Sequence, residues 1–137
     1  MKKLFLILIL LFIGNGTAFA KIYKVEKCDY DSGTNNTWEK FEYIIDTNKS
    51  NITVNRIFTD EGLDRINTIN DTKISKIQTL DYKLIYFNYP YAKGTRTSAN
   101  SEGKNNWEID INLETKRVFE LIKFENSSDF IQKFICK

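Results

Sequence analysis

The chain has 137 residues, with 20 basic and 18 acidic side chains and no histidine. The missing histidine excludes Ser-His-Asp and Cys-His catalysis and the histidine-containing zinc sites. The charges are interspersed and nearly balanced, so they give no electrostatic footprint for nucleic acid. The sequence also lacks the nucleotide-binding and zinc-protease motifs. We therefore expect no cofactor and no metal, and the composition favours a protein that is not an enzyme.

The first twenty residues have the three parts of a secretory signal peptide. Lys2-Lys3 precede an apolar run at 4–13, and Ala18-Phe19-Ala20 has the small residues of a cleavage site at −3 and −1. A run of this length is too short to span a membrane, which takes about 20 apolar residues. We predict a signal peptide at 1–20, one mature domain at 21–137 without a membrane span, and a location in the periplasm or outside the cell.

The two cysteines, Cys28 and Cys136, both fall in the predicted mature chain. Exported proteins meet oxidising conditions, so we predict a disulfide between them. In the chain-entropy model, closing a loop of about a hundred residues stabilises a domain by roughly 4–5 kcal/mol. The pair lacks the C-x-x-C spacing of redox sites, which favours a structural role. Unpaired thiols and an intermolecular bridge remain as alternatives.

Most of the mature chain alternates β-branched and aromatic residues with short Asn, Asp, Ser and Gly clusters, a pattern typical of antiparallel β proteins. We predict a mostly β, single antiparallel domain of about seven strands, as a barrel-like meander or a small sandwich, with a short C-terminal helix. The predicted strands are 21–28, 37–46, 51–59, 72–80, 82–89, 106–113 and 117–125.

Two hairpins and two helices follow from local patterns. Turns are expected at 46–50 and 114–116, where polar residues separate alternating segments. The strand after the second turn, 117–125, is apolar on both faces, so neither face can be fully in water. Its register with 106–113 is left open, because it depends on the turn length. The tail 127–137 favours a helix over a strand, and 60–70 predicts a further helical turn.

The aromatic segment at 82–91 is the strongest binding signal. Tyr82 and Tyr86 share a face with Leu84 and are expected in the core, whereas Tyr89 and Tyr91 flank the only proline and are expected to be exposed. The stretch 92–105 has almost no apolar anchor and is predicted as a long loop. Together with Arg96 in that loop, the two tyrosines Tyr89 and Tyr91 form the candidate partner-binding site.

Two weaker signals involve carboxylates. The stretch Asp29–Asn35 has oxygen side chains at alternate positions, as calcium loops do, but its glycine and the final glutamate do not fit, so an ordinary turn is favoured. Glu108 and Asp110 share one face of a strand, at a spacing that approaches that of glycosidase carboxylates. Carboxylates on one face of a solvated sheet are common, so this explanation is favoured over catalysis.

Three functions remain open. The first is a non-catalytic exported module that binds a protein or envelope component through the Tyr89–Asn105 region. The second is a lipocalin-like carrier of a small apolar ligand, although the early G-x-W motif is absent. The third is a carboxylate-based hydrolase. Lysine, asparagine and isoleucine are abundant, as in proteins encoded by AT-rich genomes, which points to a bacterial source. We expect the protein to be a monomer.

Overall fold

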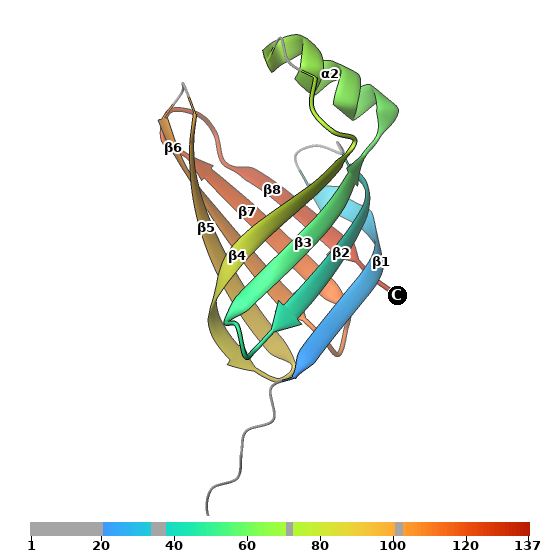
Figure 1. Ribbon diagram of the computed structural model, residues 1–137, viewed down its shortest axis with the longest axis vertical. Coiled ribbons are helices and arrows are strands. Elements are labelled where there is room, and N and C mark those ends of the chain that lie inside the picture. Colours follow the sequence, from blue (N-terminus) through green and yellow to red (C-terminus); the bar gives the residue numbers. More distant parts are fainter. Residues whose placement is uncertain (1–20, 34–37, 71–72, 101–102) are drawn as a thin grey trace, which may run out of the picture.

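The protein is an antiparallel β-barrel. The computed structural model describes residues 21–33, 38–70, 73–100 and 103–137, and its eight strands follow one another round the barrel in chain order, with β8 paired to β1 (Figure 1). The prediction of a mostly β antiparallel domain is confirmed, and the barrel-like meander is the form it takes. The predicted signal peptide at 1–20 lies outside the described residues.

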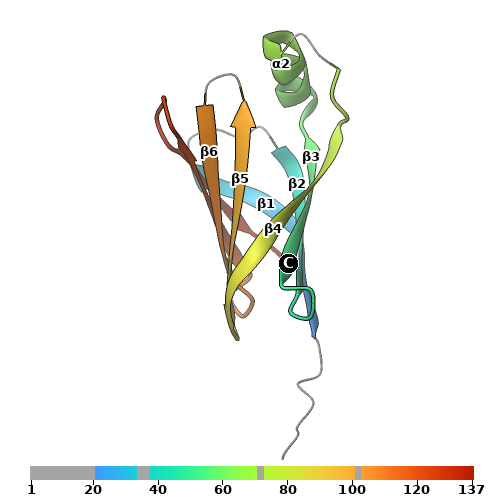
Figure 2. The same cartoon turned by 60° about the vertical axis from the view of Figure 1, so that its left-hand side comes forward.

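The strands span 6 to 12 residues and are joined by short connections, apart from one that contains a helix. Their bounds are β1 (Ile22–Gly33), β2 (Trp38–Asp46), β3 (Asn51–Phe58), β4 (Ile77–Asn88), β5 (Tyr91–Asn100), β6 (Gly103–Asn112), β7 (Arg117–Phe124) and β8 (Phe130–Ile135). The β2–β3, β4–β5 and β6–β7 turns meet at one end of the barrel, which we call the hairpin end. The opposite end carries helix α2 (Asp60–Asn70) and is called the helix end (Figure 2).

The helix begins where the sequence changes from strand to capping residues. Thr59 accepts a 3.0 Å hydrogen bond at its Oγ1 from the backbone N–H of Gly62, and Asp60 and Glu61 lie in the positively polarised first turn. Leu63 and Ile66 pack against the barrel core. The predicted helical turn at 60–70 is therefore confirmed as a helix of 11 residues. No helix among the described residues has both the length and the apolarity to cross a bilayer.

Side-chain alternation builds the core inside the barrel. Strand β3 alternates between half-buried and buried positions, because every second side chain points inward. Most of the inward side chains near the hairpin end are almost inaccessible, including Ile45, Ile52 and Ile109. Gly94 on β5 lies so close to this core that an added Cβ would meet Ile52 Cδ1 at 2.9 Å. This half of the barrel is filled by its own side chains.

The predicted C-terminal helix is wrong, because residues 130–135 form strand β8. A strand here pairs with β7 on one side and with β1 on the other, which closes the barrel. A helix would leave the backbone groups of both neighbouring strands without partners. Long-range pairing thus overrides the local helical pattern.

Four further expectations are corrected. The segment 92–105 is not a long loop, because it contains the β5–β6 hairpin, and the predicted strands 72–80 and 82–89 are one strand, β4. Tyr86 is exposed because the β4–β5 register shifts between Leu84 and Tyr86, which turns Tyr86 outward. Asp29–Gly33 continue β1 instead of turning, and 34–35 lie outside the described residues.

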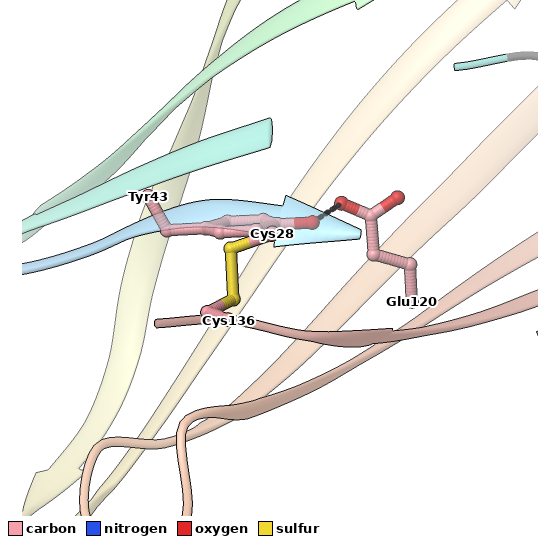
Figure 3. Close-up of a disulfide and its surroundings, with 4 residues drawn as sticks. All are labelled: Cys28, Tyr43, Glu120 and Cys136. Carbon is pink, nitrogen blue, oxygen red and sulfur yellow. Dashed lines mark hydrogen bonds between the residues drawn. A yellow bond between two sulfur atoms is a disulfide. The ribbon is translucent and has the colours of Figure 1, made fainter. Parts of the chain in front are cut away.

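The predicted disulfide is present. The sulfurs of Cys28 and Cys136 are 1.96 Å apart, and both residues are buried (Figure 3). Cys28 lies within β1 and Cys136 directly follows β8, so the bridge joins the first and last strands. These two strands also hydrogen-bond to each other, with Asp29 opposite Ile135. The disulfide therefore fastens the closing seam of the barrel.

Candidate functional site

The structure separates the residues of the predicted binding site. Tyr89 and Tyr91 flank Pro90 in the β4–β5 turn at the hairpin end, where they are 59% and 52% exposed. Arg96 lies five positions further along β5, a distance of about 17 Å at the usual rise of a strand. Its side chain occupies an inward position, and Tyr91 occupies an outward one. Tyr91 and Arg96 therefore belong to two different candidate regions, one on the outer surface of the barrel and one in its interior.

The outer region is a groove across β5 to β8. The strand register places Lys93 opposite Asp110, Asp110 opposite Phe119, and Phe119 opposite Lys133. All four are outward positions, and the groove that they help to form has a volume of about 490 Å³. Its lining residues come from β1 and from β5 to β8: Asp31, Tyr91, Ala92, Lys93, Asp110, Ile111, Asn112, Arg117, Val118, Phe119, Lys133 and Phe134.

The surroundings of the groove combine apolar surface with an excess of positive charge. Lys93 forms an ion pair with Asp110 at 3.1 Å, so these two charges offset each other. Arg117 and Lys133 form no ion pair within the described part of the chain. Asp31 also lines the groove, so three basic and two acidic lining residues leave an excess of one positive charge. On β8, next to the groove, Ile131 and Ile135 are 37% and 41% exposed. The arrangement suits an apolar group accompanied by negative charge.

The inner region is a buried polar cluster. Arg56 on β3, Glu120 on β7 and Gln132 on β8 are all buried within the barrel. The Tyr43 hydroxyl donates a 3.0 Å hydrogen bond to Oε1 of Glu120 (Figure 3). Arg56 donates from Nη2 to Oε1 of Gln78 at 3.4 Å. A charged group in a barrel interior is costly unless it is paired, so this cluster contrasts with the apolar packing at the hairpin end.

Burial sets the protonation behaviour of the cluster. It raises the pKa of Glu120 above its ordinary value, and the Arg56 charge and the Tyr43 hydrogen bond oppose that shift only in part. Burial also raises the pKa of Tyr43, and the nearby Glu120 carboxylate adds to this effect. Arg56 has its pKa lowered by burial, and the charge of Arg96 acts in the same direction.

Arg96 belongs to this inner region. Its guanidinium carbon lies 5.6 Å from the centre of the Trp107 ring, and that of Arg56 lies 5.4 Å from the same ring. Both distances fit cation–π contacts. The Trp107 indole N–H donates a 2.9 Å hydrogen bond to Ser98 Oγ, which fixes the ring between β5 and β6.

The other carboxylate signals lead to no site. Glu108 forms an ion pair with Lys123 at 2.7 Å, and Asp110 pairs with Lys93, so each acid has a basic partner on the outer surface. Among the described residues, no cluster of three or more histidine, cysteine or acidic side chains could hold a metal ion. The possible calcium segment Asp29–Asn35 contributes strand residues as far as Gly33.

The sequence predictions named Arg96 only as part of the candidate partner-binding site and did not predict the inner cluster. Arg56 stands out in the sequence, because it interrupts the apolar face formed by Ile52, Val54 and Phe58. Glu120 gives the same signal, since it lies between Val118 and Ile122 on the inward face of its strand. Only the strand register of the closed barrel shows that Arg56 and Glu120 both lie in its interior.

No protein-family model, curated protein or solved structure matches the chain. The function must therefore be inferred from the geometry of these two regions.

Proposed function

We propose that the protein is an exported, non-catalytic binding module that docks an extended segment of a partner protein in the outer groove across β5 to β8. The observation that carries this proposal is the 490 Å³ groove with Phe119 in its lining. A groove of this size accommodates one or two side chains of a partner. Tyr91, part of the candidate site in the sequence, lines the same groove.

The outward face of β7 supports a docking role. Its neighbour β6 carries acidic residues at outward positions, and these are matched by lysines. The corresponding positions of β7 hold Phe119 and Leu121, which remain partly exposed. Apolar side chains gathered on an otherwise charged surface are typical of interaction sites. Folding does not require them there, because the barrel core lies on the other side of the strand.

The charges round the groove define the chemistry of the partner. Arg117 and Lys133 line the groove on neighbouring strands, and acidic side chains on the partner would pair with them. The partner segment is therefore one with an aromatic or aliphatic side chain next to aspartate or glutamate. Its apolar side chain contacts Phe119, and its acids face the two cations.

Export is the second part of the proposal. The apolar run at 4–13, followed by Ala18-Phe19-Ala20, has the pattern of a cleaved signal, and the Cys28–Cys136 disulfide is compatible with an oxidising compartment. The mass of the protein isolated from its natural host tests this directly. We expect a chain that begins at Lys21 and carries one disulfide. A retained leader or two free thiols would contradict export.

The docking proposal is tested by selecting binders from a random peptide display library on the immobilised mature domain. We expect enrichment of peptides that place an aromatic or aliphatic residue beside acids, and weaker binding to Phe119→Ser and Lys133→Glu. The matched control is Lys83→Glu, the same charge reversal at an exposed position on β4. About tenfold weaker binding to K133E, with K83E unchanged, supports the groove. Failure to enrich peptides, or equal binding to all variants, would overturn it.

A further inference from the structure

Four exposed apolar side chains lie at the hairpin end of the barrel, outside the outer groove. Ile22 begins β1, Ile85 and Tyr86 lie where the β4–β5 register shifts, and Tyr89 lies in the β4–β5 turn. Each of the four keeps at least 46% of its surface exposed. We call these four residues the end patch. The lining of the outer groove contains none of them.

The end patch belongs to one continuous tip of the barrel. The ring centres of Tyr23 and Tyr89 are 6.0 Å apart, and those of Tyr23 and Phe87 are 5.0 Å apart. These contacts bring the start of β1 against the β4–β5 turn, although β1 and β4 are not neighbours in the sheet (Figure 1). Ile22 and Tyr89 are therefore exposed at the same tip.

The barrel core does not need the end patch as a cover. Tyr23 and Phe87 are half-buried and pack against the core, so they close the interior at this end. The exposed sides of Ile22, Ile85 and Tyr86 lie outside this closure. Exposed apolar side chains gathered at one place mark contact with a protein or with a membrane.

The hairpin end also carries an excess of positive charge. Its segments are 21–22, 46–51, 83–93 and 112–117. Lys93 within them is offset by its ion pair with Asp110. The remaining charged residues are five basic and two acidic ones, which leaves an excess of three positive charges: Lys21, Lys49, Lys83, Lys116, Arg117, Asp46 and Glu114.

This combination of side chains is complementary to a membrane surface with anionic lipids. Tyrosine is enriched at the boundary between membrane and water, because its ring is apolar and its hydroxyl group is polar. Lysine has a long apolar stem, so its ammonium group can stay among the headgroups while a neighbouring apolar side chain enters the bilayer. Anionic headgroups attract basic residues in this position.

We propose that the hairpin end of the barrel binds the surface of a membrane that contains anionic phospholipids. The end patch enters the boundary between the headgroups and the acyl chains, and the surrounding lysines contact the lipid phosphates. The helix end then faces away from the membrane (Figure 2). This is a second binding function, and it does not depend on the docking of a peptide in the outer groove.

The test is co-sedimentation of the oxidised mature domain with lipid vesicles. One kind of vesicle consists of phosphatidylcholine, and the other of phosphatidylcholine mixed with phosphatidylglycerol. Ile85→Ser removes an apolar side chain from the end patch. Ile77→Ser is its matched control, because Ile77 is 60% exposed against 55% for Ile85 and lies at the helix end of the same strand. Lys83→Glu is compared in the same way with Lys104→Glu, at an exposed position near the helix end of β6.

We expect the parent to bind the mixed vesicles about tenfold or more tightly than vesicles of phosphatidylcholine alone, because the lysines are attracted to the anionic lipid. I85S and K83E should each weaken binding to the mixed vesicles about tenfold, because one loses apolar burial and the other reverses a charge. I77S and K104E should bind as the parent does. Circular dichroism checks the folding of each variant, and the lysine pair decides alone should I85S fail to fold.

The proposal is overturned if the parent does not sediment with the mixed vesicles, if it binds both kinds of vesicle equally, or if I85S and K83E bind as the parent does. It is also overturned if the end patch joins two copies of the chain, which sedimentation velocity would show as a dimer that I85S separates. A parent that docks peptides but does not bind vesicles would refute this proposal and leave the outer groove unaffected.

Discussion

Tyr43 and Glu120 lie 77 positions apart in the chain and meet inside the barrel through a 3.0 Å hydrogen bond from the tyrosine hydroxyl to the carboxylate. The bond connects β2 with β7, two strands that are not neighbours in the sheet. Replacing buried ionic groups by apolar residues is often neutral or stabilising, so stability alone does not account for Glu120. The carboxylate and Arg56 mark the part of the interior that is specialised for polar contacts.

The first prediction concerns the pH dependence of stability. Burial raises the pKa of Glu120 in the folded state, so above the ordinary value of 4.5 the folded protein holds a proton that the unfolded chain releases. Glu120 therefore lowers the free energy of unfolding as the pH rises through this window. Glu120→Gln lacks this term and keeps the acceptor for Tyr43. The free energy of unfolding is measured in urea for E120Q and for the parent at about pH 4 and about pH 8. The value for E120Q, relative to that of the parent, should be higher at pH 8 than at pH 4. If the difference in unfolding free energy between E120Q and the parent does not change with pH, the raised pKa of Glu120 is contradicted.

The second prediction concerns the hydrogen bond itself. Tyr43→Phe leaves the buried Glu120 without its donor, and we expect a loss of about 1–3 kcal/mol in the free energy of unfolding. Tyr91→Phe removes a hydroxyl from an exposed ring and should change stability by less than about 0.5 kcal/mol. At a pH where Glu120 is ionised in the folded protein, the Y43F loss should shrink in an E120Q background, because a neutral amide is a weaker acceptor than a carboxylate. If the two losses simply add, the two side chains are not coupled in solution.

The third prediction concerns the closing seam. Cys28→Ala combined with Cys136→Ala should lower the free energy of unfolding by about 2–5 kcal/mol, because the bridge joins the two ends of a long chain segment. Alanine leaves no buried hydroxyl at either position. Denaturant unfolding of the oxidised parent and of the double variant provides the comparison. Equal midpoints would mean that the β1–β8 hydrogen bonds close the barrel without help from sulfur.

The fourth prediction concerns the filled half of the barrel. An added Cβ at Gly94 would lie 2.9 Å from Ile52 Cδ1 and 3.0 Å from Ile109 Cγ2, which is too close for unaltered packing. Gly94→Ala should therefore lower the free energy of unfolding by about 1–3 kcal/mol. Thr97→Ala, at an exposed position of the same strand, is the control. A stable G94A variant with unshifted methyl resonances for Ile52 and Ile109 would show that this half has unfilled space.

The sequence predicted the local features that alternation and turn chemistry determine. The strands near 37–46, 51–59, 106–113 and 117–125 and the turns between them follow from adjacent residues. The disulfide follows from the presence of two cysteines in a chain that carries an export signal. The C-terminal strand could not be predicted in this way, because Phe130, Ile131, Phe134 and Ile135 also fit a helical stripe. Their state depends on pairing with β1, which lies about a hundred residues earlier.

The candidate sites were predicted only in part, and for the same reason. Tyr91 and Arg96 are close in sequence, but strand alternation places them on opposite sides of the barrel wall. The groove arises from a row of residues on four strands, and nothing in the sequence of β7 alone relates Phe119 to Lys93 or Lys133. Arg56 and Glu120 each interrupt an apolar face, yet their shared interior depends on barrel closure.

The most direct measurement of the central claim is amide chemical-shift mapping of the mature domain with a selected peptide. Docking in the outer groove predicts that the largest shifts cluster at Lys93, Asp110, Phe119 and Lys133, one row across β5 to β8, and that they vanish with Phe119→Ser. Shifts that cluster instead at Arg96 and Trp107, or that spread over the whole barrel, would contradict it.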